Sequence, residues 1–547
     1  MPAPVSTTQR PRYALPLLGL LLLGLLGCNR GLWTPDEPRE AEISREMLLM
    51  PSVIPTLNRQ RFIEKPPLYY WVVAGVFRLT GGPSVLAARG VSVAAGLGTL
   101  ALLFCWGASA HSRRAGLLAA FMLATSVQFM VSTHWVLIDP LLMLSTTIAA
   151  WAAWELLARR DSAWLRLTLY LALGLALWIK GLIGPVLLGA GLLAYIVIDR
   201  PAHWRRLRPL LGIALLSAAV AVLALAILNQ GGRAALWEWA YVNHVQRLFS
   251  PGATGHRQPL AYYLWTLPYA LLPWLVPLIE ALRPAHWRRQ SVAAGAAARA
   301  ATPDVARYGA LMSGAMLVLL SISASKRETY LLPVLPLLFI WLGIRSDQWW
   351  QQWQPRSGPA LGAAWWLQVT LLCVFCVMAP LAAWIWIKSL TLVILAALLL
   401  GLLPVASLLY SSARAQRGRS GAWALTAAFT GSALLLALAP LVLNDTKDMG
   451  PFVRAVGQQL PPGQPVFAIN VDETLAAEIP FYTGREVIPL DIRSLRTPPL
   501  RARLPEWVLL QDSQEARPGT LPSDYVMLAA RAFGPQRNLS LWHRRGV

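Results

Sequence analysis

Long apolar runs recur along this chain of 547 residues, and they restrict its fold more than any other feature. About 20 apolar residues are enough to cross a bilayer as one helix. Charged residues make up only 14% of the chain, against about 25% in soluble domains. We therefore predict an α-helical polytopic membrane protein with about thirteen transmembrane helices and amphipathic interfacial helices. The predicted spans are 13–30, 83–109, 114–132, 137–157, 163–180, 182–198, 209–229, 260–282, 306–324, 329–345, 361–387, 390–411 and 421–443.

Basic residues indicate which way the spans run. The net charge of +22 would suggest nucleic acid in a soluble protein, but here the basic residues form short clusters between apolar runs. The lipid bilayer is therefore the expected partner, and no nucleic acid is expected. With a cytoplasmic N-terminus, every purely basic loop falls on the cytoplasmic side, as the positive-inside rule requires. We predict a transmembrane domain over 1–443 and, after an odd number of spans, an outer soluble domain over 444–547.

The outer segment has the pattern of a small α/β domain. VFAIN (466–470), EWVLLQ (506–511), YVMLAA (525–530) and NLSLWH (538–543) are predicted strands, and ETLAAEIPFYTG (473–484) is a predicted helix that ends at its glycine. We find no glycine pattern for nucleotide binding in it, so no nucleotide cofactor is expected.

Unusual polar residues gather in the outer loops, which mix acids, bases, histidines and tyrosines. The cytoplasmic loops, in contrast, are almost purely basic. Charge at membrane depth is costly and usually functional. We therefore expect a functional site at the outer leaflet, carried by loops 31–82 and 230–259, with Asp139 nearby at the outer end of the fourth span.

The stretch DEPREAEISREM (36–47) follows the first apolar run and contains five acids. Thr34 or Asp36 is a candidate N-cap of a helix, and Ile43 and Met47 fall on one face of it. Taken alone, the stretch is most simply an interfacial amphipathic helix, with Asp36 as a cap and a solvated acidic face. A functional role for Asp36 is the alternative.

The stretch FIEKPPLYYW (62–71) contains two consecutive prolines, which favour a stiff, extended segment. Such a segment would hold Glu64 and Lys65 in fixed directions at the interface. The alternative is a snorkelling lysine beside an aromatic belt that includes Tyr69 and Tyr70.

Two further outer segments carry candidate ligands. In 243–263, His244 with Glu64 could hold a metal such as zinc, although no spacing there is diagnostic. Neutral, hydrogen-bonded histidines are the alternative. In SKRETY (325–330), two cations and a tyrosine hydroxyl suit a phosphate. The alternative for this turn is anchoring by lipid head groups.

These motifs together resemble the 4-amino-4-deoxy-L-arabinose lipid A transferases. That family is part of the GT-C glycosyltransferases, which use polyprenyl-phosphate donors and include the protein mannosyltransferases. The EKPPLYYW string is specific to the aminoarabinose branch, whereas an acid in the first outer loop is general to GT-C enzymes. The residues that carry the resemblance are DEPREAEISREM (36–47), FIEKPPLYYW (62–71), the turn at Asp139, NHVQRLF (243–249), HRQPLAYY (256–263) and SKRETYLLPVLP (325–336).

The resemblance implies a GT-C fold and a multi-pass protein of the bacterial inner membrane, with its site facing the periplasm. It implies a donor, undecaprenyl phosphate that carries the aminosugar, and an acceptor, a phosphate of lipid A. An aminosugar on that phosphate lowers its negative charge, which weakens the binding of polymyxin and other cationic peptides.

The resemblance also implies roles for individual residues. Asp36 is expected to act as a base or to position the acceptor, with Asp139 as its partner and Arg39 as a third catalytic candidate. Because cations must stabilise the phosphate leaving group, the donor-phosphate candidates are Lys65, Arg247, Lys326, Arg327 and Tyr330. The substrate-binding candidates are Glu64, Tyr69, Tyr70, His256, Tyr262 and Tyr263, and the metal candidates are Glu64 and His244.

Two alternative functions remain open from the sequence. The first is transfer of another sugar, such as mannose, to a protein hydroxyl, in which Asp36 would be a general base. The second is a flippase for lipid-linked sugars. Transporters tend to have internal repeats and polar residues at the bilayer midplane, whereas here we find no repeat and the unusual charges lie near span ends.

Overall fold

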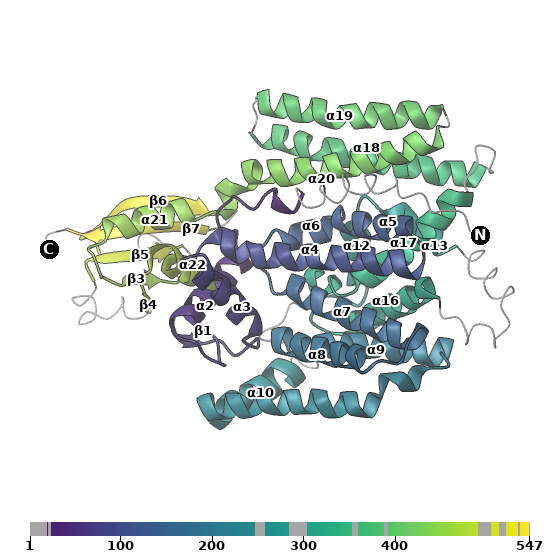
Figure 1. The fold of residues 1–547 in the computed structure, drawn as a ribbon. Helices are drawn as coiled ribbons and strands as arrows, with labels where there is room; N and C mark the ends of the chain where they lie inside the picture. Colours follow the sequence, from purple (N-terminus) through teal and green to yellow (C-terminus); the bar gives the residue numbers. More distant parts are fainter. Residues whose placement is uncertain are drawn as a thin grey trace.

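The chain folds, in a computed structural model, into parallel layers of long helices with a small sheet domain at one end (Figure 1). The structure describes residues 19, 23–246, 257–283, 304–352, 359–387, 392–414, 416–490, 505–512, 521–533 and 537–545. Within these residues, eight helices are long and apolar enough to cross a membrane. They lie in α4 (Val85–Ala110), α7 (Asp139–Ala158), α8 (Ala163–Lys180), α10 (Pro209–Trp237), α16 (Val305–Ile322), α18 (Pro359–Ile387), α19 (Leu392–Ala413) and α20 (Arg417–Lys447).

Two further candidate spans are bent helix pairs. The first pair is α5 (Arg113–Ala124) and α6 (Val127–Thr133), between which the helix direction bends by 66°. The second is α12 (Tyr262–Leu271) and α13 (Leu275–Ala281), between which it bends by 117°. Counting each pair as one span gives up to ten spans in the described residues. Helices α9 (Ile183–Asp199) and α17 (Leu335–Gln352) match two more predicted spans, and the predicted span 13–30 lies largely outside the described residues. The chain is a multi-pass membrane protein, and the total of thirteen spans stays a prediction.

Burial separates central helices from peripheral ones. The apolar window of α7 is 72% buried inside the protein, whereas that of the segment containing α10 is only 17% buried. Helix α10 accordingly lies at the edge of the bundle (Figure 1, bottom). Small residues bring α4 and α5 together, since a Cβ added at Gly107 would lie 2.6 Å from Gly116 Cα. Such close backbone approach is a common way to pack helices in membranes.

Helices α2 (Asp36–Leu49) and α3 (Leu68–Leu79) and strand β1 (Thr56–Leu57) lie at the end of the bundle that also carries the sheet (Figure 1, left). Helix α2 packs against α3 and against a helix of the C-terminal domain, α22. As predicted, the proline-containing residues before α3 are not helical, but the helix begins directly after them. The short elements of the transmembrane part are α2 (Asp36–Leu49), β1 (Thr56–Leu57), β2 (Gln60–Arg61), α3 (Leu68–Leu79), η2 (Trp204–Leu207), η3 (Glu238–Gln246) and η4 (Glu328–Leu331).

The C-terminal segment forms a five-stranded mixed sheet in the order β4-β3-β5-β7-β6. The strands β4, β3 and β5 are parallel, and β5, β7 and β6 are antiparallel. The four predicted strands and the predicted helix are confirmed, including its end at Gly484, which adopts a left-handed φ of 69°. Helix α21 and strand β4 were not predicted. The elements are α21 (Gly450–Gln459), β3 (Val466–Ile469), α22 (Glu473–Thr483), β4 (Val487–Leu490), β5 (Trp507–Gln511), β6 (Tyr525–Phe533) and β7 (Arg537–Arg544).

Candidate active site

Helix α2 carries five acids at the end of the bundle that also carries the sheet, and all five are buried. No side chain caps the helix, and Pro35 stands at its N-cap, so the predicted caps at Thr34 and Asp36 are wrong. The solvated acidic face is also wrong, because these carboxylates find their partners inside the protein. The five acids, each at most 7% exposed, are Asp36, Glu37, Glu40, Glu42 and Glu46.

Glu37 anchors α2 to the helical bundle. Its carboxylate lies 2.8 Å from Arg89 Nε and 2.6 Å from Arg30 Nη1. It also accepts hydrogen bonds from the backbone N–H groups of Trp33 and Val136. Arg89 lies in α4 and is fully buried, as is Glu37. The sequence analysis missed this pair, although an arginine inside an apolar span is a signal that a buried partner exists.

Asp36 is held between two arginines. Arg327 Nη2 lies 2.5 Å from Asp36 Oδ2, Arg327 Nη1 lies 3.3 Å from Oδ1, and Arg39 Nη2 lies 2.9 Å from Oδ1. Burial by itself would raise the pKa of Asp36, but the charges of Arg327 and Arg39 outweigh it and lower the pKa to about 2. Asp36 is therefore a carboxylate at neutral pH. The contact joins two predicted motifs that are 291 residues apart.

Glu40 lies one turn after Asp36 on α2, and its carboxylate accepts hydrogen bonds from a second group of predicted site residues. Lys65 Nζ lies 2.5 Å from Glu40 Oε1, Arg39 Nη2 lies 2.9 Å from the same oxygen, and Tyr70 Oη donates to Glu40 Oε2 at 2.8 Å. Lys65 lies in a bend just after a turn at 63–64, and α3 begins at Leu68, so the extended segment predicted from the two prolines is wrong. Arg39 thus bridges Asp36 and Glu40, and the two carboxylates share one cationic network.

Asp139 forms the third acid centre of the site. It begins α7, and its Oδ1 lies 2.5 Å from Lys180 Nζ at the end of α8. The same ammonium group lies 4.7 Å from the centre of the Tyr330 ring. Lys180 was not among the predicted site residues. Its signal in the sequence was a lysine at the outer end of an otherwise apolar span.

Lys326 differs from the other cations of the site because it pairs with no carboxylate in the described residues. Its side chain is buried, and its Nζ donates to the backbone carbonyl of Gln258 at 3.1 Å. A desolvated ammonium group without a counter-charge is costly. Burial accordingly lowers the pKa of Lys326. An anion beside it would relieve this cost.

The predicted substrate-binding tyrosines lie in two places, beside the turn that carries Arg327 and in the core next to α2. Tyr263 Oη donates to the Arg327 carbonyl at 3.1 Å, and Tyr262 Oη lies 3.2 Å from Glu328. Tyr69 is fully buried, with its ring edge-on to the Tyr70 ring. The two rings are therefore buried where α3 packs against α2, and they do not form an aromatic belt facing lipid.

The predicted metal ligands and two further predicted residues lie mostly outside the described residues. Arg247 and His256 lie outside the described residues, as does the side chain of His244. Glu64 is partly buried in the turn before α3. Within the described ranges, no three histidine, cysteine, aspartate or glutamate side chains converge to hold a metal ion.

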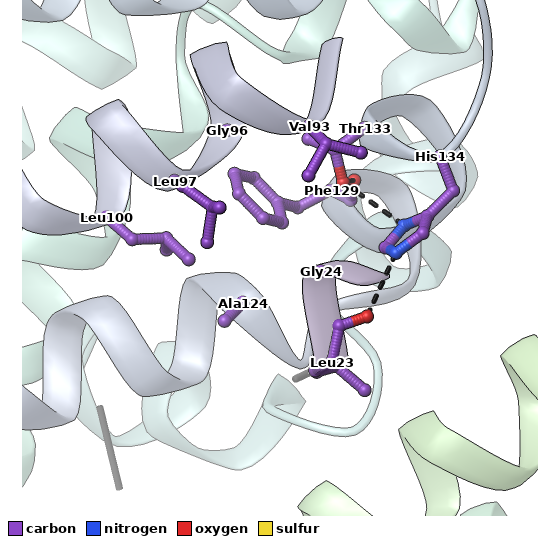
Figure 2. A pocket seen from close by; sticks show the side chains of 10 residues that line it. All are labelled: Leu23, Gly24, Val93, Gly96, Leu97, Leu100, Ala124, Phe129, Thr133 and His134. Carbon is purple, nitrogen blue, oxygen red and sulfur yellow. Dashed lines mark hydrogen bonds between the residues drawn. The ribbon is translucent and has the colours of Figure 1, made fainter. Parts of the chain in front are cut away.

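A small apolar cavity lies between α4, α5 and α6 (Figure 2). His134 and Thr133 form its polar end, where His134 Nε2 lies 3.0 Å from the Leu23 carbonyl. Its volume of about 20 Å³ has room for about one water molecule. This cavity is too small for a sugar or a lipid chain, so the charged cluster is the better candidate site.

The chain is similar to several known sequences. A family model described as dolichyl-phosphate-mannose-protein mannosyltransferase matches residues 28–236. Undecaprenyl phosphate-alpha-4-amino-4-deoxy-L-arabinose arabinosyl transferase 1 of Sodalis glossinidius is 33% identical over 332 residues, which are 59% of this chain and 54% of that protein. The corresponding transferase of Pseudomonas aeruginosa (strain UCBPP-PA14) is 29% identical over 61% of this chain and 60% of that protein. The chain thus matches between half and two thirds of the length of these relatives.

Comparisons with solved structures support the fold. The crystal structure of ArnT from Cupriavidus metallidurans bound to undecaprenyl phosphate aligns with a TM-score of 0.75 and 20% identity over 97% of each chain. The archaeal oligosaccharyltransferase AglB from Archaeoglobus fulgidus aligns with a TM-score of 0.52 and 10% identity, over 91% of this chain and 69% of that one. The predicted helical GT-C fold and the predicted resemblance to the aminoarabinose transferases are confirmed.

Proposed function

We propose that this protein is a glycosyltransferase that moves 4-amino-4-deoxy-L-arabinose from undecaprenyl phosphate to a phosphate of lipid A. The reaction takes place at the periplasmic face of the bacterial inner membrane, and its product confers resistance to polymyxin and other cationic peptides. The proposal is supported by the names of the similar proteins and by the charged cluster around Asp36.

The single observation that carries the proposal is the ammonium group of Lys326, which is buried beside Arg327 and pairs with no carboxylate among the described residues. Arg327 is already neutralised by Asp36, so Lys326 is the described cation best suited to a new anion. A phosphate group meets this need, since it accepts several charge-assisted hydrogen bonds at once. The donor and the acceptor of the proposed reaction both carry phosphate.

The proposed reaction is a substitution at the anomeric carbon of the aminosugar. A phosphate oxygen of lipid A forms the new bond to this carbon, and the bond to the donor phosphate breaks with its electron pair, which releases undecaprenyl phosphate. Negative charge therefore grows on the leaving phosphate, where preorganised cations lower the barrier most. We assign Lys326 to the leaving phosphate, with Lys65 and Arg327 as further cations and Tyr330 as a hydroxyl donor.

Asp36 has a role in this scheme that does not require proton transfer. A general base works best when its pKa lies near the operating pH, and the two arginines hold the pKa of Asp36 at about 2. An acceptor phosphate is already ionised at neutral pH and needs no base. We propose that Asp36 positions the acceptor or binds the sugar ammonium group, with Asp139 as its partner.

A second candidate is transfer of mannose from a polyprenyl phosphate to a protein hydroxyl. The family model that matches residues 28–236 favours it. A hydroxyl acceptor must lose a proton, so this reaction needs a general base. The low pKa of Asp36 makes that carboxylate a weak base, which is why we rank phosphate as the acceptor.

We also propose that zinc, if it binds, does so at Glu64 and His244, because carboxylate and imidazole suit this metal. No step of the proposed reaction depends on it. Metal analysis of the purified protein, with Glu64→Gln as the comparison, tests the assignment. A zinc content that is unchanged by the substitution would reject it.

Mass spectrometry of lipid A tests the proposed function. A strain that lacks this chain is complemented with the wild type, with Asp36→Asn, or with the control Asp161→Asn, whose carboxylate is exposed and lies between α7 and α8, at the ends of these helices opposite Asp139. We expect the wild type and the control to restore the aminosugar, and Asp36→Asn to reduce it by about a hundredfold or more. Wild-type levels with Asp36→Asn would reject the role of Asp36, and mannose on periplasmic proteins would favour the second candidate.

A further inference from the structure

The short segment that leads into Asp36 is held by the C-terminal part of the chain. Residues 32–35 precede α2, and each of these four consecutive residues makes a polar contact with a different residue between 444 and 482. The contacts are Leu32 N to Tyr482 Oη at 3.0 Å, Trp33 Nε1 to Asn444 Oδ1 at 2.9 Å, Lys447 Nζ to Thr34 O at 3.2 Å, and Thr474 Oγ1 to Pro35 O at 3.3 Å.

These contacts matter because the start of α2 has no cap of its own. Pro35 donates no backbone hydrogen bond, and no side chain of the segment caps the helix. Asp36 is the first residue of α2, so the path of the preceding segment determines where its carboxylate lies. The C-terminal domain also reaches the site directly, because Glu473 at the start of α22 lies 3.5 Å from Arg39 Nη1.

Tyr482 is the most firmly placed of these partners. Its ring is edge-on to the Phe481 ring at 5.4 Å, and the Arg454 guanidinium lies 4.8 Å from its centre. On another side it packs against Gly450, where an added Cβ would be only 2.8 Å from the ring. The Leu32 residue to which it connects is fully buried, so water cannot easily replace the Tyr482 hydroxyl as the acceptor of the Leu32 N–H.

We propose that Tyr482 and helix α22 are a positioning element of the active site. They hold residues 32–35 on the path that presents Asp36 to Arg327, and they act through the backbone of α2 and not by contact with substrate. This inference rests on the proposed transferase function and deepens it, because it gives the C-terminal domain a part in catalysis. It predicts that loss of the Tyr482 hydroxyl alone slows the transfer of the aminosugar.

Hydrogen–deuterium exchange of the full-length protein tests whether the segment is held. Tyr482→Phe removes only the hydroxyl and keeps the ring. Tyr525→Phe is the matched control, since its hydroxyl also bonds to a backbone group, here by donating to the carbonyl of Pro505 in the same domain. We expect faster exchange in the peptide that covers residues 31–36 with Tyr482→Phe and no change there with Tyr525→Phe. Unchanged exchange with Tyr482→Phe would overturn the inference, whatever reaction the protein catalyses.

Steady-state kinetics with the lipid-linked aminosugar test whether this support matters for catalysis. We expect Tyr482→Phe to lower kcat about tenfold, since small displacements of a reacting group are costly, and to leave KM within about twofold. Thr474→Val should act in the same direction, and Thr474→Ser, which retains the hydroxyl, should restore the rate. A rise in KM alone, or an equal loss of kcat with Tyr525→Phe, would overturn the positioning role. A wild type that transfers no aminosugar would reject the proposed function, and the exchange experiment would still decide whether the segment is held.

Discussion

Replacement of Glu37 by glutamine removes one negative charge from the interior and changes the side-chain volume very little. The partners of this carboxylate, Arg89 and Arg30, have side chains that are 0% and 3% exposed. Both stay protonated, because guanidinium groups do not lose their proton in proteins. The amide group of a glutamine would also present N–H donors to groups that are themselves donors. Glu37→Gln therefore leaves two buried cations without their counter-charge.

The expected loss of stability is large for a single isosteric change. Breaking a buried ion pair by removing one partner costs about 3–5 kcal/mol. Arg89 also donates to the backbone carbonyls of Cys28, Arg30 and Gly31, which offsets part of this, so we expect about 4 kcal/mol. Unfolding entropy of about 2 cal/mol/K per residue over 547 residues converts this value to a fall in Tm of about 3–4 °C.

Thermal unfolding of the detergent-purified protein, followed by tryptophan fluorescence, measures this effect. The matched control is Asp161→Asn, which breaks an ion pair with Arg166 in which the aspartate side chain is 55% exposed. Exposed pairs contribute at most about 1 kcal/mol, so the control should shift Tm by less than about 1 °C. If Glu37→Gln unfolds at the temperature of the control, the buried network does not anchor α2 as we argue.

Two further predictions follow from single side chains. Lys326→Met should raise the KM for the lipid-linked donor about tenfold, because a cation at this point binds phosphate. Lys326→Arg keeps the charge and should have a KM closer to that of the wild type. Equal KM values for both variants in steady-state assays would contradict the assignment. Glu478 is fully buried and forms no ion pair in the described part of the chain; burial, and then the charge of Asp448, raise its pKa well above the usual range. A raised carboxyl pKa means that the folded state holds a proton that the unfolded state releases, so stability should fall as pH rises from about 4.5 towards that raised pKa. Glu478→Gln should remove this component and unfold at a higher temperature than the wild type at pH 8, as thermal scans from pH 5 to 8 would reveal.

Local patterns were enough to predict much of the fold. Apolar runs and their basic flanks depend only on neighbouring residues, so twelve of the predicted spans have counterparts among the described helices and bent pairs. The apolar run in VFAIN and the glycine after the helix at 473–483 are equally local signals, and both were correct. The same logic failed at Thr34, where a capping pattern was present but the side chain does not cap the helix.

The candidate site was predicted in part for the same reason. Asp36, Lys65 and Arg327 stood out because charges are rare in such an apolar chain, and the structure brings them into one network. Glu37 was missed, since it looks like a solvated helix residue until its buried partner is known. Lys180 stands at the end of an apolar span but was not assigned to the site, and only the structure shows its pairing with Asp139. Nothing in the local sequence indicated that Tyr482 lies against the segment before α2.

The sequence by itself determined that this chain crosses a membrane many times and collects its unusual polar residues on one side, because hydropathy and charge are properties of short segments. Only the tertiary structure decided which charges neutralise each other. Asp36 and Arg327 are 291 residues apart, and Leu32 and Tyr482 are 450 apart. Contacts of this kind depend on how whole helices pack, and an acidic helix has the same sequence whether it is solvated or, like α2, enclosed by the protein.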